Sequence, residues 1–283
     1  MWSKLEQTFL RTLGPTALTK LASIPLPTQR FLITVGGDQL TGKSSLTRAL
    51  TKSSVLQSVV NGRIAHRSTG QTMRDLAAER GVGIGELSNI LAQNSADDGA
   101  IVDVNLDYKT CEVVLGKYEN DASMLVLEGR QPAVMASFCS EQVPTNTQIP
   151  FRVYLKCSVR EQALRYVGRE VSEVARMEVE KYLPSNEMYE TMEDVLERIQ
   201  GQVFFGQHGK MEEIVAGFRT NMDRDADDKV RFDQLYGEEC HYRNEKFYDL
   251  VVDTSFIEEE EKLNQVSSGW MEWLVENNFG IRQ

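Results

Sequence analysis

The sequence predicts an α/β fold in three layers, with a parallel β-sheet between two layers of helices. Short apolar segments, of the kind that form strands buried on both faces, alternate along the chain with longer segments of helical character. The length of 283 residues suits one such domain with extensions or insertions. Four segments are expected to form strands: RFLITVGG at 30–37, MLVLEGR at 124–130, FRVYLKC at 151–157 and YDLVVDTS at 248–255.

Helices are expected before, between and after these strands. Residues 1–24 should form one or two helices, and residues 44–51 should form a helix directly after the first strand. Near the C-terminus, an amphipathic helix should bury Trp270 and Trp273 in the core. That helix is expected at 269–280, and the other helical segments are expected at 72–81, 160–171 and 211–222.

These elements divide the chain into three parts. A helical extension comes first, a central α/β domain follows, and a C-terminal helix ends the chain. Within the central domain, a long helical region before the last strand is expected to form a lid that carries an inserted segment. The parts are 1–29, 30–256 with the lid at 170–232, and 257–283.

The composition narrows the classes of function. The formal net charge of −11 argues against a protein that wraps long nucleic acid, although it leaves room for a local basic pocket. No apolar run approaches the ~18 residues that span a membrane, and the N-terminus lacks the apolar stretch of a secretion signal. The four cysteines are widely spaced without a CxxC pair, which favours a reduced, cytoplasmic protein over a disulfide framework or a zinc site.

One motif points directly to a ligand. The segment GDQLTGKS, from Gly37 to Ser44, fits the pattern G-x-x-x-x-G-K-[ST] between the first expected strand and the helix after it. Such a loop can turn several backbone N–H groups towards an anion, and the following helix adds its N-terminus. The lysine can reach the β- and γ-phosphates of a nucleotide, and the serine hydroxyl can ligate Mg²⁺. We therefore expect a P-loop NTPase fold that binds ATP and Mg²⁺ through Gly37, Asp38, Gln39, Leu40, Thr41, Gly42, Lys43, Ser44 and Ser45, with Ser44 as the metal ligand.

Asp38 is an unexpected residue for an anion-binding loop. A carboxylate in an anion-binding loop repels phosphates. Its side chain should therefore point away from the ligand or serve another partner.

Two further segments carry candidate phosphate ligands. Glu128 and Arg130 follow a buried strand, where ligands of open α/β sheets bind, and an arginine there can clamp a phosphate. Glu128 can orient the waters of Mg²⁺ or an arginine, or it can belong to a buried structural ion pair. Gly70 and Arg74 are spaced i, i+4 at a helix start, which places Arg74 beside a close backbone approach unless it is only a surface residue.

The segment from 219 to 237 is rich in charge. Arg224 and Arg231 are seven residues apart, so both lie on one face of a helix among five aspartates. Arginines of this kind suit a lid that closes on a transferring phosphoryl group. The same segment taken alone also fits a solvent-exposed helix with surface ion pairs.

The order of these segments resembles a known family. The P-loop is followed by STGQTMRDLAAERG, VLEGR, R-D-x-x-D-x-x-R-F-x-x-L-Y-G and YDLVVDTS, an order similar to that of the cytidylate kinases, especially the compact archaeal-type branch of the nucleoside monophosphate kinases. The resemblance covers residues 30–170 and 219–256. It implies phosphoryl transfer from ATP·Mg²⁺ to a pyrimidine nucleoside monophosphate such as CMP or dCMP. It also implies an acceptor site at Gly70, Arg74, Arg130 and Asp228, lid arginines at Arg224 and Arg231, and an adenine end near Asp253-Thr254.

Several positions depart from the family pattern. Leu40 stands where family loops usually have glycine, Asp38 where they have proline or a small residue, and Asp227 where the lid often has arginine. Residues 181–215 look like extra length in the lid. Other acceptors therefore stay open: a modified pyrimidine nucleotide, a hydroxymethylated base in DNA or a small hydroxyl compound. A nucleotide-binding protein without transfer activity is a further alternative, and the sequence leaves the oligomeric state open.

Overall fold

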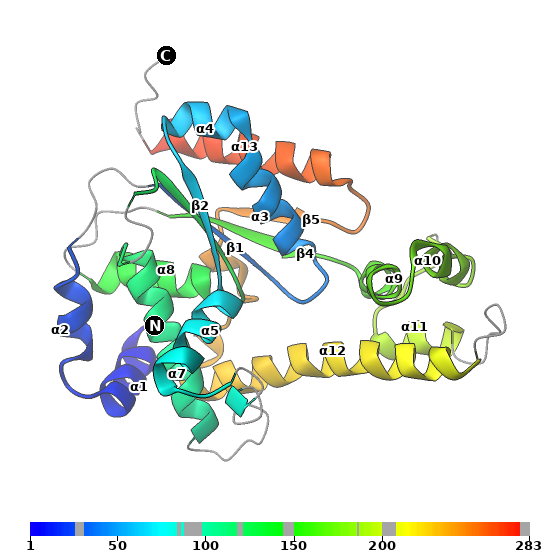
Figure 1. The fold of residues 1–283 in the computed structure, drawn as a ribbon, viewed down its shortest axis with the longest axis horizontal. Coiled ribbons are helices and arrows are strands. Elements are labelled where there is room, and N and C mark those ends of the chain that lie inside the picture. Colours follow the sequence, from blue (N-terminus) through cyan, green and yellow to red (C-terminus); the bar gives the residue numbers. More distant parts are fainter. Residues whose placement is uncertain are drawn as a thin grey trace.

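A five-stranded parallel sheet forms the centre of the part of the chain described by the computed structural model, residues 1–25, 31–83, 86–87, 98–117, 121–143, 150–185, 187–199 and 208–277. The strand order is β2-β3-β1-β4-β5, and every pairing is parallel (Figure 1). The α/β class with a parallel sheet is thus confirmed. The strands are β1 (Phe31–Gly37), β2 (Ile64–Ser68), β3 (Met124–Glu128), β4 (Phe151–Lys156) and β5 (Leu250–Asp253).

Strand β2 was not expected from the sequence, whereas the other four strands lie within their expected segments. Its sequence, IAHRS, puts His66 and Arg67 into a five-residue strand and so hides the apolar pattern. In the described sheet β2 is an edge strand that pairs with β3 alone. An edge strand is partly exposed to solvent, so its residues need not all be apolar. Arg67 is nevertheless buried, and it forms an ion pair with Asp75 of the next helix.

One face of the sheet is covered by three helices (Figure 1). Their apolar residues form one core cluster with the side chains that the strands direct to this face, among them Ile33, Val35 and Val153. Trp270 and Trp273 belong to this cluster and are buried, as expected. The helices are α3 (Lys43–Lys52), α4 (Ser54–Val60) and α13 (Glu259–Glu276).

The opposite face is covered by the N-terminal helices and by helices from the middle of the chain. Phe9 illustrates the packing, because its ring contacts the rings of Tyr108, Phe138 and Tyr236 from three different helices. The first two helices therefore share a core with the sheet. The elements of this layer are α1 (Ser3–Leu13), α2 (Ala17–Ala22), α7 (Asp98–Val114), α8 (Pro132–Gln142) and the C-terminal half of α12 (His208–Tyr236). Helix α5 (Thr69–Arg80) packs on α7 through a small apolar cluster of its own.

Much of the region expected to be a lid, together with the helix before it, forms a helical unit with an apolar cluster of its own. Helices α9, α10 and α11 pack with the N-terminal half of α12 around an apolar cluster that includes Leu164, Val195 and Phe218. Helix α12 then runs back to the main body (Figure 1). Two short 3₁₀ helices, η1 (Glu238–Cys240) and η2 (Glu245–Phe247), follow it and lead into β5. The expected helix at 211–222 is part of α12. The helices of this unit are α9 (Val159–Glu170), α10 (Glu173–Glu180), α11 (Met192–Ile199) and α12.

Parts of the expected elements lie outside the described residues. These are 26–30 before β1, 186 and 200–207 within the expected lid insertion, and 278–283 at the C-terminus. In the described part of the chain, no helix is both long enough and apolar enough to cross a membrane.

Candidate functional site

The glycine-containing loop connects β1 to α3, as the motif requires. Its backbone is left-handed or otherwise positive in φ at Gly37 (144°), Leu40 (61°) and Gly42 (88°). A Cβ at Gly37 would lie 2.6 Å from the carbonyl oxygen of Leu155, so this position excludes a side chain. Alternation of such residues with right-handed ones is how a short loop forms a concave nest of N–H groups.

Leu40 adopts a conformation that leucine rarely takes. Its side chain packs against the apolar cluster of the α9–α12 unit. This contact connects the loop to the α9–α12 unit.

Lys43 curls back over the loop. Its Nζ donates to the carbonyl oxygen of Gly37 at 2.8 Å and also to that of Asp38. Burial and the positive charge of Arg130 lower the pKa of Lys43 to about 8, against the opposing effect of nearby carboxylates. The ammonium group is thus held at the loop and close to Arg130.

Asp38 has partners outside the loop. Its carboxylate accepts hydrogen bonds from the hydroxyl of Tyr242 at 2.6 Å and from Nε of Arg243 at 3.0 Å. Both residues lie in the segment between α12 and β5. The sequence left two alternatives for Asp38: a side chain that points away from the ligand, or one that binds another partner. These contacts fit the second alternative, with Tyr242 and Arg243 as the partners.

Glu128 lies at the carboxyl end of β3, facing the start of α3. Its carboxylate accepts hydrogen bonds from Ser44 Oγ at 2.9 Å and Thr47 Oγ1 at 2.7 Å, and His66 Nε2 lies 3.3 Å away. Burial alone would raise the pKa of Glu128, but the hydrogen bonds from His66, Thr47 and Ser44 outweigh it and lower the pKa. An ionised carboxylate therefore stands next to the serine of the motif. Sequence reasoning missed His66 together with its strand.

Arg130 belongs to a cluster of alternating charges. It forms ion pairs with Asp225 and Asp228 of α12, and Asp228 also pairs with Arg231. Arg231 in turn pairs with Asp103 of α7, at 3.0 Å. We call these five residues the arginine–aspartate cluster. It brings together three residues selected from the sequence and two that were missed, Asp103 and Asp225.

The cluster is tied to the loop. The backbone N–H of Gln39 donates to Asp225 Oδ2 at 3.1 Å, and Gln39 Nε2 donates to the carbonyl oxygen of Asn221 at 3.2 Å. Asp225 is 2% exposed, and burial raises its pKa even though Arg130 opposes the shift. Helix α12 therefore presents carboxylates to both the loop and Arg130.

The remaining sequence-selected arginines lie outside these ion pairs. Arg224 is exposed on α12, although burial of its head group and the charges of Arg130 and Arg231 lower its pKa. Arg74 is exposed on α5 and donates from Nη2 to Gln71 Oε1 at 2.7 Å. Gly70 lies in the first turn of the same helix. Within the described ranges, no ion pair joins Arg74 to the arginine–aspartate cluster.

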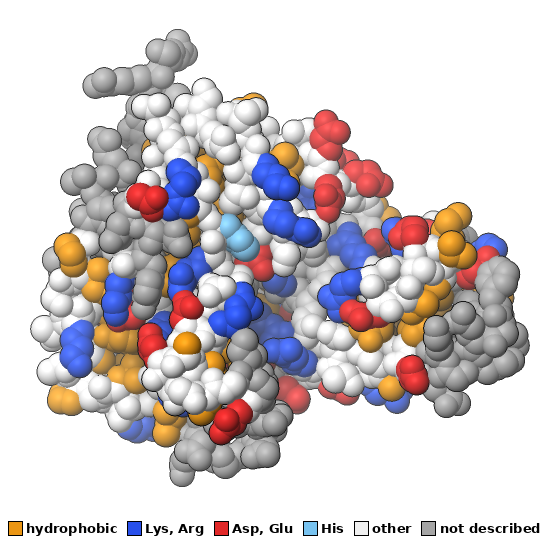
Figure 2. Space-filling view, viewed as in Figure 1, with side chains coloured by type: hydrophobic (Ala, Val, Ile, Leu, Met, Phe, Trp, Pro, Cys, Tyr) orange, Lys and Arg blue, Asp and Glu red, His pale blue; other side chains and the backbone are white. Residues whose placement is uncertain are grey.

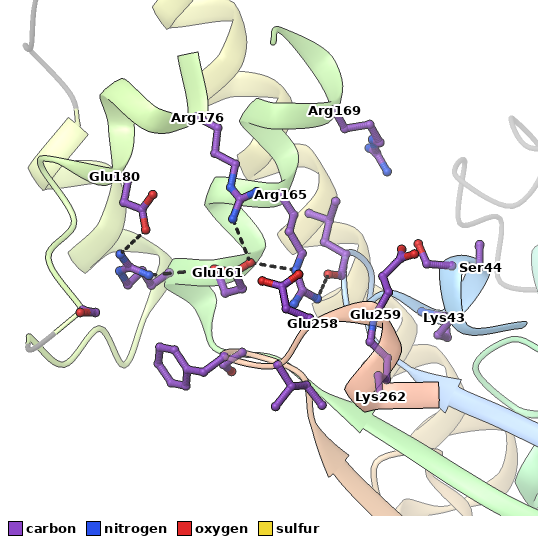
Figure 3. Close-up of a pocket in the computed structure, with 18 of the residues that line it drawn as sticks. Lys43, Ser44, Glu161, Arg165, Arg169, Arg176, Glu180, Glu258, Glu259 and Lys262 are labelled. Atoms are coloured by element: carbon purple, nitrogen blue, oxygen red, sulfur yellow. Dashed lines mark hydrogen bonds and ion pairs between the residues drawn. The ribbon is translucent and has the colours of Figure 1, made fainter. Parts of the chain in front are cut away.

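A cavity of about 650 Å³ opens on the other side of the loop. It lies between the start of α3, helices α9 and α10, and the turn before α13 (Figure 3). Figure 2 shows Lys and Arg side chains gathered around the hollow between the main body and the α9–α12 unit. The charged residues that line the cavity are Lys43, Arg48, Arg160, Glu161, Arg165, Arg169, Arg176, Glu180, Glu258, Glu259 and Lys262.

Arg165 joins three elements at the cavity wall. It pairs with Glu161 at 3.0 Å, and its Nη1 donates to the carbonyl oxygen of Leu40 and to Thr254 Oγ1, both at 3.1 Å. Asp253 and Thr254, the two residues expected near the adenine, lie beside this contact. Thr254 is buried and its hydroxyl donates to the carbonyl oxygen of Thr41 at 3.0 Å, and the carboxylate of Asp253 accepts from Ser255. These bonds support the loop. Arg165 and Arg169, spaced i, i+4 after β4, were a signal available in the sequence.

Comparisons with known proteins add no relative. No protein-family model matches the chain, and a search of curated proteins finds no match. The function must be inferred from the loop, the two charged regions beside it and the cavity.

Proposed function

We propose that this protein transfers the γ-phosphoryl group of ATP to a pyrimidine nucleoside monophosphate, CMP or dCMP. The observation that carries the proposal is the position of Lys43. It lines the cavity on one side of the loop and lies close to Arg130 and Asp225 on the other. A lysine between a nucleotide-sized cavity and an arginine cluster suits a phosphoryl group that passes from donor to acceptor.

The donor nucleotide would lie along the loop and in the cavity. The nest and the first turn of α3, with Ser44 and Ser45, offer N–H groups and a helix N-terminus to the triphosphate. The nucleoside would occupy the space next to Arg165 and the turn before α13. At about 650 Å³ the cavity is within the range of small-molecule sites.

The residues at the end of the loop fit a magnesium ion. Ser44 Oγ and the Glu128 carboxylate are 2.9 Å apart, and both are the hard oxygen donors that Mg²⁺ prefers. Mg²⁺ in such enzymes is held by few protein groups together with substrate phosphates and water, so a cluster of three protein ligands is not required. The described residues contain no such cluster. When bound, the ion would neutralise charge on the donor phosphates.

The acceptor would bind at the arginine–aspartate cluster. Each Nη of Arg130 carries two N–H donors, so its pairing with aspartates leaves donors for a monophosphate. A phosphate oxygen of the acceptor attacks the γ-phosphorus, a new P–O bond forms, and the bond to the β–γ bridging oxygen breaks. The products are ADP and a nucleoside diphosphate. An ionised phosphate needs no strong base, so positioning and charge neutralisation by Lys43, Arg130 and Arg231 supply the catalysis.

The test is ADP formation with ATP·Mg²⁺ and a panel of acceptors: CMP, dCMP, UMP, AMP, GMP, dTMP, hydroxymethylpyrimidine nucleotides and DNA. We expect turnover with CMP or dCMP above all others. Turnover with none of the monophosphates would overturn the proposal.

A second acceptor class is favoured by the lid. Helices α10 and α11 give this unit an apolar core of its own, and Asp227 is exposed on α12. An enlarged lid suits a modified pyrimidine nucleotide or a hydroxymethylated base in DNA. Transfer of labelled γ-phosphate to such an acceptor, with none to CMP, would favour this second candidate. Loss of transfer activity is less supported, because the partners of Asp38 lie outside the loop.

A further inference from the structure

Lys262 is a buried lysine that faces the loop from α13. Only 4% of the residue is exposed, yet it lines the cavity (Figure 3). A Cβ built on Gly42 would lie 2.7 Å from its Nζ and 3.6 Å from Nη1 of Arg165. Two cationic groups from two helices therefore converge on the backbone of Gly42, immediately before α3 begins.

The ammonium group of Lys262 has no ion-pair partner among the described residues. Among the residues that the structure describes, no carboxylate lies within 4.0 Å of Nζ, and Nζ makes no hydrogen bond. Glu258 and Glu259 are near in sequence, but both are exposed. Burial and the charge of Arg165 lower the pKa of Lys262, against the opposing effect of Glu259. A buried cation without a partner is destabilising, and such groups gather at ligand sites.

Lys43 and Lys262 contact different parts of the loop. Lys43 donates to Gly37 O and lies next to Arg130, on the acceptor side. Lys262 lies against Gly42 and Arg165, on the side of the cavity that extends towards the turn before α13. A donor nucleotide with its nucleoside in the cavity and its γ-phosphate near Lys43 would pass Lys262 between the two.

We propose that Lys262 is a second phosphate-binding lysine, which contacts the donor's phosphates nearest the nucleoside. This inference rests on the proposed function, because it takes the cavity as the donor site. It adds a phosphate-binding residue from α13, which lies outside the loop motif. Since the contact would not involve the γ-phosphate, it would serve ATP and ADP alike, and it would raise affinity without changing the chemical step.

The test compares ligands that differ only in phosphate. Dissociation constants for ATP, ADP and adenosine, with Mg²⁺ present for the nucleotides, are measured for the wild type, Lys262→Met and Lys262→Arg. Calorimetry serves for the nucleotides and ligand-observed NMR for adenosine. We expect Lys262→Met to weaken ATP and ADP binding by roughly 10- to 100-fold, the range for a charged hydrogen bond, and to leave adenosine within about threefold. Lys262→Arg should retain most of the affinity.

Controls separate the possible failures. Lys52→Met removes the same charge from an exposed position at the end of α3 and should bind all three ligands like the wild type. Lys262→Gln, which keeps a polar end, replaces Lys262→Met if thermal unfolding shows that the latter is not folded. Wild-type affinity for ATP and ADP in the variant, or an equal loss for adenosine, would overturn the inference alone. A wild-type protein that binds neither nucleotide would overturn the proposed function as well.

Discussion

The two sides of the loop differ in how their charges are satisfied. On the acceptor side, Arg130 and Arg231 are paired with buried aspartates, so each cation already has a partner. On the cavity side, Arg165 is also paired, with Glu161, but Lys262 has no carboxylate within 4.0 Å among the described residues, and it lines the open cavity. Under the proposed function, a donor would meet at least one unpaired cation, Lys262, whereas an acceptor phosphate would compete with the aspartates that pair with Arg130 and Arg231. Substitutions on each side should therefore act on different steps.

The largest effect is expected for Lys43, which belongs to both sides. Lys43→Ala should lower kcat by at least about 10³-fold, because one preorganised charge that stabilises the transition state is worth roughly 10²–10³ and this one also binds the donor. ADP formation under saturating ATP and CMP measures it. Lys52→Ala is the matched control, with activity expected to be unchanged. Turnover near the wild-type rate in Lys43→Ala would remove the loop from the mechanism.

Arg130→Ala should act on the acceptor side alone. We expect kcat/KM for the acceptor to fall by about 10²-fold, with the dissociation constant for ATP within about threefold of the wild type. The variant should also be less stable, because Asp225 and Asp228 lose a partner while buried. Steady-state kinetics and calorimetry measure the two effects, and Arg74→Ala, outside the cluster, should change the acceptor constants less. A loss of ATP affinity as large as the fall in kcat/KM for the acceptor would show that Arg130 does not act on the acceptor alone.

A smaller, pH-dependent effect is expected behind the acceptor side. Asp107 of α7 is buried and accepts a hydrogen bond from the hydroxyl of Tyr236 at 2.8 Å, and burial raises its pKa to about 8. A carboxyl group whose pKa is higher in the folded state stabilises the fold while it is protonated. This contribution is complete below the unfolded pKa near 4 and is lost as the pH rises towards 8.

Asp107→Asn should therefore flatten the dependence of stability on pH. The amide can still accept the Tyr236 hydrogen bond, and it does not ionise. We expect the variant to gain on the order of 2 kcal/mol over the wild type at pH 8.5 relative to pH 5. Denaturant unfolding at the two pH values measures this. Parallel pH profiles of the two proteins would show that Asp107 ionises normally.

The smallest effect concerns the contact between loop and lid. Leu40→Gly removes the strained conformation together with the lid contact, so its stability should stay within about 1 kcal/mol of the wild type. Leu40→Ala loses the same contact but keeps the strain, and it should be less stable than Leu40→Gly by about 1 kcal/mol. Urea unfolding of the pair measures the difference. The reverse order of stability would mean that the backbone at residue 40 is not strained.

The parts of the fold that sequence reasoning located are those with a local signal. Four strands have near-continuous apolar sequences, whereas β2 carries His66 and Arg67 and was missed. The loop was found because its motif is defined by residue spacing within eight positions. Contacts between distant elements were not found. Arg231 and Asp103 form an ion pair although they are 128 positions apart, and no pattern in either segment predicts the pairing.

The same limit applies to the cavity. Arg130, Asp228 and Arg231 were selected individually, but their pairing depends on the packing of α12 against the end of β3. Lys262 lies in a glutamate-rich helix start, which by pattern is a solvent-exposed segment. Only the packing of α13 beside α3 places its ammonium group at Gly42.

Helix α12 has a mechanical consequence for any opening of the lid. Its 29 residues make a rod about 44 Å long at 1.5 Å per residue. Phe218 anchors one end in the lid cluster, and Tyr236 anchors the other in the main core. A rod fixed in this way tilts as a lever. Asp225 and Asp228 lie on this rod and pair with Arg130 of the main body. A tilt of α12 would therefore shift the partners of Arg130, so a movement of the α9–α12 unit is transmitted to the arginine–aspartate cluster.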